Sequence, residues 1–164
     1  MSINPAHIHL ALNHVPVLGV LFGTILLAMG LWRRNDTIRR TSLVVLLLTG
    51  AAAGAVYLTG EPAEELIENA AGVSEKRIER HEDAAAVATS GAALLGVAAL
   101  VLLWRARRTG LMSSRLLVGI FGLALLTTVL MAWTANLGGQ IRHSEITTAG
   151  VTSTETATPD EADE

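Results

Sequence analysis

The chain has 164 residues, of which 51% are apolar and 16% are charged, and its formal net charge is −3. An ordinary soluble domain carries roughly 25% charged residues, so this composition argues against one. The sequence contains no cysteine, which excludes disulfides, thiolate metal sites, iron–sulfur clusters, covalent c-type haem attachment and cysteine nucleophiles. The net charge is too small to steer nucleic acid towards the protein, so no nucleic-acid partner is expected.

Four apolar stretches without a charged side chain predict an all-α, polytopic membrane protein. They cover residues 15–32, 42–59, 84–104 and 116–137. Roughly 20 helical residues cross a 30 Å hydrocarbon core, and none of the stretches has the period-two alternation of a barrel strand. We therefore expect one four-helix transmembrane domain over residues 1–145. Residues 146–164 are rich in threonine and acids without an apolar period, which predicts a disordered tail.

The sequence of the first helix predicts where it starts and where it bends. Asn4 followed by Pro5 is typical of an N-cap and a first helical position. The helix would run to about Trp32. We expect a bend within it, because Pro16 cannot donate a backbone hydrogen bond to the carbonyl of Leu12.

The segment between the second and third spans predicts further helix boundaries. Residues 62–71 indicate a short outer amphipathic helix that Gly72 stops. Ser74 is a candidate N-cap for the third long helix, which would start well outside the membrane and continue into its span. The Gly-Gly pair at 138–139 is expected to end the fourth long helix.

The arginines predict the orientation in the membrane. Eight of the twelve basic residues lie in the two short loops between spans one and two and between spans three and four. By the positive-inside rule both loops are cytoplasmic. The segment 61–83 carries eight acids and faces outward, and both termini are expected outside. The aromatic residues expected at the membrane interfaces are Trp32 and Trp104 on the inner side and Tyr57 and Trp133 on the outer side.

All five histidines fall in the predicted outer half of the protein: His7, His9, His14, His81 and His143. At a rise of 1.5 Å per residue, His14 and His81 differ in depth by about 6 Å, within reach of one cofactor. Glu61 lies on the same level. His7 and His14 share a helix face, and His9 points elsewhere unless Pro16 alters the local geometry. No ionisable residue lies inside a span, which argues against an ion-coupled transporter.

Small residues lie below these histidines. Ala85, Ala88 and Ala92 follow His81 on one helix face. Gly50 and Gly54 share a face of the second helix. A flat macrocycle between helices needs imidazoles on facing helices with small side chains beside them. Close packing of helices in lipid also requires small residues, so the stripes fit both explanations.

The first hypothesis is a haem b protein that transfers electrons at the outer face, an electron carrier or accessory protein rather than a stand-alone enzyme. His14 and His81 would be the axial ligands. His143 or His9 would be a replacement ligand or a partner for the haem propionates. Its partners would be the lipid bilayer and a membrane or periplasmic redox protein, and oligomers are compatible with it.

The second hypothesis is a non-haem divalent metal site, and the third is a structural subunit of a membrane complex. The metal ligands would be His14, His81, His143 and Glu61, with Glu64 or Glu65 adding oxygen ligands. Nitrogen and carboxylate ligands without thiolate suit zinc, copper(II) or iron. In the third case the histidines would only face a partner protein.

Two motifs resemble a family of bacterial four-span membrane proteins catalogued as a domain of unknown function. His9 to Pro16 has the spacing His-x4-His-x-Pro, and Leu137-Gly138-Gly139 is followed by His143. The resemblance spans residues 7 to about 145 and implies a multi-pass protein of the bacterial inner membrane. Some members of that family are joined to Rieske-type domains, which implies redox work by association only.

Overall fold

The computed structural model describes residues 4–68 and 73–142, and every regular element in them is helical. The helices are α1 (Pro5–Leu12), α2 (His14–Trp32), α3 (Asp36–Tyr57), α4 (Gly60–Glu64), α5 (Glu75–Thr109) and α6 (Ser114–Arg142). The expected all-α fold class is confirmed. The predicted acidic tail over 146–164 lies outside the described residues.

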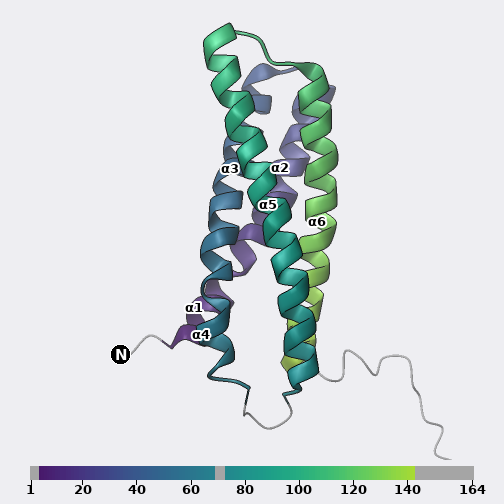
Figure 1. Ribbon diagram of the computed structural model, residues 1–164. Coiled ribbons are helices and arrows are strands. Elements are labelled where there is room, and N and C mark those ends of the chain that lie inside the picture. The colour runs from purple at the N-terminus through teal and green to yellow at the C-terminus, as the bar shows by residue number, and fades with distance from the viewer. Residues whose placement is uncertain (1–3, 69–72, 143–164) are drawn as a thin grey trace, which may run out of the picture.

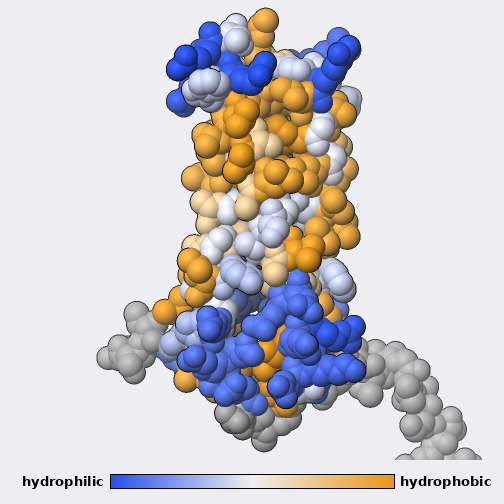
Figure 2. All heavy atoms as spheres, in the orientation of Figure 1, coloured by the Kyte–Doolittle hydropathy of each residue, from blue (hydrophilic) through white to orange (hydrophobic). Residues whose placement is uncertain are grey.

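The four long helices α2, α3, α5 and α6 run side by side along one axis (Figure 1). Each packs against two neighbours, in the ring order α2–α3–α5–α6, and α1 packs against α4 at one end. Four helical segments, with α1 and α2 counted together, are long and apolar enough to cross a membrane. Figure 2 shows their apolar side chains as a belt between two polar ends. These features indicate a multi-pass membrane protein.

The two ends of the bundle differ in composition. We call the end with the α2–α3 connection (33–35) and the α5–α6 connection (110–113) the arginine end. The opposite end, with α1, α4, the first turns of α5 and the last turns of α6, is the histidine end. At the arginine end the guanidinium carbons of Arg33 and Arg108 lie 5.9 Å and 4.7 Å from the ring centres of Trp32 and Trp104. Cation–π contacts at these distances are attractive.

The core lies in the middle of the bundle and towards the arginine end. Its largest fully buried side chains include Leu27, Leu43, Leu46, Leu95 and Leu117, one or two from each long helix. The hydroxyls of the buried Thr24, Thr127 and Thr134 each donate to the carbonyl four residues earlier in the same helix. Apolar packing of this kind fixes the arrangement of the long helices.

Gly50 allows the backbones of α3 and α5 to touch. A Cβ at Gly50 would lie 2.7 Å from the carbonyl oxygen of Ala92 and 3.2 Å from the Cα of Gly96. The expected packing role is therefore confirmed for Gly50. The same expectation is wrong for Gly54, because a Cβ there would meet nothing within 4 Å. The two glycines lie on one face, but only Gly50 is at the point where the helices meet.

The first predicted helix is divided in two. The Asn4 side chain accepts a 2.9 Å hydrogen bond from the backbone of Ala6, which confirms the predicted cap. Asn13 alone separates α1 from α2. It keeps right-handed helical dihedral angles and donates its N–H to the carbonyl of His9, so the interruption is local and lies where Pro16 is expected to disturb the helix. The interruption follows from Pro16, which lacks the N–H that the carbonyl of Leu12 would accept.

The short outer helix is smaller than predicted. It begins at Gly60 and ends at Glu64, and residues 65–68 form turns. Residues 69–72, including the predicted stop at Gly72, lie outside the described part of the chain. Acids four residues apart repel each other along a helix, and negative charge is unfavourable near its C-terminus. Both effects oppose a continuation through Glu65 and Glu68.

The fourth long helix does not end at the predicted Gly-Gly pair. It continues through 138–139 to Arg142. Two contacts with α5 hold this last turn: the Arg77 guanidinium donates a 3.0 Å hydrogen bond to the carbonyl of Gln140, and His81 packs on Gly138. The predicted start of α5 is correct, because Ser74 is its N-cap residue, although its side chain makes no capping bond.

Candidate functional site at the histidine end

His81 lies near the start of α5 and is held against α6. Its Nδ1 atom is 3.0 Å from the carbonyl oxygen of Thr134. A carbonyl only accepts hydrogen bonds, so Nδ1 carries the proton and Nε2 keeps its lone pair. The ring also packs on Gly138, where a Cβ would lie 3.0 Å from the imidazole Cε1. The missing side chain at Gly138 is what allows the imidazole to lie against α6.

His9, on α1, is held in the same tautomer by the end of α3. Its Nδ1 atom is 3.0 Å from the Thr59 hydroxyl. That hydroxyl donates its only proton to the carbonyl of Val56 at 2.6 Å, so it accepts from His9. The lone pair of His9 is therefore on Nε2. Gly60 lies beside this ring, since its Cβ would be 3.9 Å from the imidazole Cε1.

Burial lowers the pKa of His81, and the charge of His9 lowers it further. His14 is exposed and its Nδ1 atom lies 3.2 Å from the carbonyl of Leu10, a residue of the same N-terminal segment. His7 is also exposed. The predicted site residue His143 lies outside the described residues.

A pair of carboxyl groups joins α4 to α5 at this end. The side chains of Glu64 and Glu82 share a hydrogen bond, which raises the pKa of Glu64 from an ordinary value of 4.5 to about 7. Partial burial and the negative charges of Glu82, Glu68 and Glu61 raise this pKa further in the same direction. One proton is therefore shared between two acids that would otherwise repel each other. The predicted ligand Glu61 is exposed and acts on this pair through its charge.

The predicted divalent metal site needs three or more ligands in one place. Within residues 4–68 and 73–142, no three His, Asp or Glu side chains gather closely enough to hold a metal ion. The described members of the predicted set, His14, His81 and Glu61, are thus not assembled there. A haem needs only two axial ligands from the protein.

Several contacts of this site carry no signal in the sequence. Thr134 contributes only a backbone carbonyl, and any residue could supply it. Thr59 follows the end of a helix, as many threonines do, so its position does not distinguish it. The carboxyl pair joins residues 18 positions apart, on either side of the segment 69–72, so its partners could not be chosen among the eight acids of 61–83.

The protein was compared with known families, with curated proteins and with solved structures. No protein-family model matches the chain, and neither a curated protein nor a solved structure matches it.

Proposed function

We propose that this membrane protein holds one haem b at its histidine end, with His9 and His81 as axial ligands, and that it transfers electrons there. The observation that carries the proposal is that both imidazoles are held in the same tautomer. Each donates its Nδ1 proton to an oxygen acceptor, and each keeps the lone pair on Nε2. Metal-ligating histidines are typically held in this way, because the outer hydrogen bond fixes the ring and makes the ligand more basic.

The two rings also share the kind of residue that lies beside them. Glycine lies beside each imidazole, Gly60 by His9 and Gly138 by His81, so no side chain from these positions covers the rings. The donor set is two neutral imidazoles without thiolate, which suits haem iron. Bound haem would supply one-electron chemistry. The chain itself would orient the ligands through Thr59 and the carbonyl of Thr134.

The proposal differs from the pair expected from sequence, His14 and His81, in one ligand. His14 is exposed and bonded to the backbone of its own segment, whereas His9 is part-buried, bonds to Thr59 and acts through its charge on the pKa of His81. His9, which the sequence predicts as a replacement ligand, is thus proposed as an axial ligand. His14 and His9 lie on the same short segment, which makes them a matched pair for an experiment.

The test is the visible spectrum and the haem content of the full chain purified in detergent. We expect a Soret band and sharp α and β bands on reduction. His9→Ala and His81→Ala should each lose most of the haem while helical content and membrane insertion are kept. His14→Ala is the control and should keep the wild-type haem content.

Three results would overturn the proposal. Loss of haem in His14→Ala but not in His9→Ala would restore the pair expected from sequence. A colourless protein with stoichiometric zinc, copper or iron would favour the non-haem hypothesis. A colourless protein without metal would leave the structural-subunit hypothesis, in which the histidines face a partner protein.

We propose further that the arginine end is cytoplasmic, in a bacterial inner membrane, so that the haem site faces outward. The support is the positive-inside rule applied to the eight arginines of the two loops. Reporter fusions after Arg40 and Arg108 should then be active in the cytoplasm, and a fusion after Ser74 should be active outside. The opposite pattern would place the histidine end in the cytoplasm and contradict a periplasmic redox partner.

A further inference from the structure

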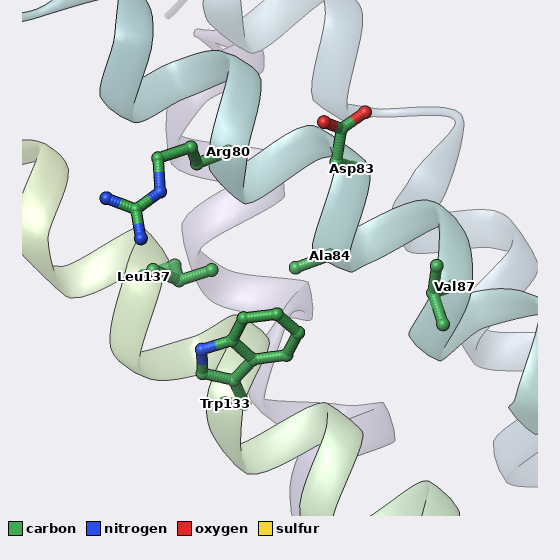
Figure 3. Close-up of a pocket in the computed structure, with 6 residues that line it drawn as sticks. All are labelled: Arg80, Asp83, Ala84, Val87, Trp133 and Leu137. Atoms are coloured by element: carbon green, nitrogen blue, oxygen red, sulfur yellow. The ribbon is translucent and has the colours of Figure 1, made fainter.

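A groove runs between α5 and α6 at the histidine end, and neither His9 nor His81 lines it. Its volume is about 330 Å³. The lining residues, drawn in Figure 3, are Arg80, Asp83, Ala84, Val87, Trp133 and Leu137.

The groove is apolar inside and open along its length. Ala84 and Leu137 form a buried floor, with 5% and 7% of their surface exposed. Val87 and Trp133 are exposed walls, at 56% and 53%. An open groove with an apolar floor, on the outer surface of a bundle that spans a membrane, is of the kind that an acyl chain fills.

Two opposite charges stand at the rim of the groove. Arg80 and Asp83 are exposed and lie three residues apart on α5, which places their Cβ atoms about 5–6 Å apart. They make no ion pair with each other, and Figure 3 shows the Arg80 side chain extended towards α6 while the Asp83 carboxylate points away from it. Neither side chain bonds to another described residue, so both charges are available to a ligand.

The depth of these residues matches the layers of a bilayer. Arg80 and Asp83 directly precede the uncharged stretch 84–104, so they lie at the level of lipid headgroups. Val87 lies one turn deeper, at the level of the acyl chains, whereas Leu137, the neighbour of Gly138, lies beside Arg80. Trp133 is an exposed aromatic residue of the kind that gathers at membrane interfaces. The groove therefore presents a positive and a negative charge above an apolar trough.

We propose that this groove binds a phosphatidylethanolamine molecule. Arg80 binds the lipid phosphate, and the Asp83 carboxylate accepts hydrogen bonds from the primary ammonium two carbons away. One acyl chain lies on Ala84 and Leu137 beside Trp133. Phosphatidylglycerol has no ammonium group for Asp83. Phosphatidylcholine has a cation that cannot donate a hydrogen bond, so both fit the rim less well.

The experiment uses Trp133 as the reporter of what occupies the groove. Trp32→Phe and Trp104→Phe together leave Trp133 as the one tryptophan of the full chain. The protein is reconstituted in phosphatidylcholine vesicles that contain increasing fractions of one lipid brominated on its acyl chains, which quenches nearby tryptophan fluorescence. Brominated phosphatidylethanolamine should quench Trp133 with a relative binding constant about fivefold above that of brominated phosphatidylcholine, the gain of one interfacial charge contact.

Two controls separate recognition from general lipid contact. Asp83→Asn should remove the preference for phosphatidylethanolamine, and Glu79→Gln, an exposed acid one turn away that does not line the groove, should keep it. A protein with Trp104 as its single tryptophan should show no such preference, because Trp104 lies at the arginine end.

Three results would overturn the proposal. Equal quenching of Trp133 by all three lipids would mean that the groove makes only the contacts of any lipid-facing surface. Stronger quenching by phosphatidylglycerol would mean that Arg80 acts alone on anionic lipids. An equal loss of preference in Glu79→Gln and Asp83→Asn would assign the effect to net charge rather than to the groove.

Discussion

The middle of the bundle and its histidine end are held together by different forces. In the middle, leucines such as Leu46 and Leu95 are fully buried and α3 touches α5 at Gly50. At the histidine end, helices meet through polar contacts such as His9 with Thr59 and the hydrogen bond of Glu64 with Glu82. The Oδ1 atom of Asn13 is buried there without a hydrogen-bond partner among the described residues.

This difference means that apolar contacts determine the fold, whereas polar contacts at the histidine end provide groups for chemistry. Apolar packing is dense and non-directional, and it arranges the four long helices without any histidine. Polar contacts are individually weak, but they fix tautomers, share protons and leave lone pairs unused. The comparison predicts that changes in the middle alter stability, and that changes at the histidine end alter chemistry more than stability.

The largest effect on stability is expected from Gly50→Ala. The added Cβ would lie 2.7 Å from the carbonyl oxygen of Ala92, a backbone atom that cannot rotate away. We expect a loss of about 1–3 kcal/mol, the usual cost of overpacking, measured by thermal or denaturant unfolding in detergent. Gly54→Ala is the matched control on the same helix face and should be nearly neutral, because its Cβ meets nothing within 4 Å. Equal effects of the two changes would contradict the assigned contact between α3 and α5.

Much of the fold follows from the sequence because it depends on periodic, local signals. The four uncharged stretches predict the long helices, and Asn4, Pro16 and Ser74 predict where helices start or are interrupted. The predictions are wrong at positions where tertiary contacts determine the local structure. Gly54 has the same spacing as Gly50 but no partner, and the pair at 138–139 stays helical because α5 holds the last turn of α6.

A smaller effect is expected from Gly138→Ala at the histidine end. The new Cβ would lie 3.0 Å from the His81 ring and push it by a few tenths of an ångström, which strains its 3.0 Å hydrogen bond to Thr134. We expect a loss of about 0.5–1.5 kcal/mol, the net worth of one hydrogen bond. Nitrogen NMR of His81 should also show a mixture of tautomers. Gly139→Ala should leave both measurements unchanged, since a Cβ there meets nothing within 4 Å. An unchanged tautomer in Gly138→Ala would show that Gly138 does not position the ring.

The candidate site is less predictable from the sequence than the fold. The sequence identifies His81 as a candidate ligand. It favours His14 over His9 as the second ligand, because an uninterrupted helix would point His9 elsewhere. The contact of His9 with Thr59 reverses this order, and it depends on the packing of α1 against α4. Pairing of Glu64 with Glu82 depends on the path of the chain between α4 and α5. Neither relation is local in the sequence.

The smallest effect is expected from the carboxyl pair, as a change in pH dependence. The pKa of Glu64 is raised to about 7 in the folded protein from an ordinary 4.5, so the folded state binds the proton more tightly than the unfolded state. The stability that this proton contributes is fully present below about pH 4.5 and is lost as the pH rises through about 7. Glu64→Gln keeps a hydrogen-bond donor for Glu82 but cannot titrate, so unfolding midpoints measured from pH 5 to 8 should fall less steeply than in the wild type. Glu65→Gln, an exposed neighbour, should retain the wild-type slope. If Glu64→Gln also retained that slope, the shared proton would not contribute to the attachment of α4 to α5.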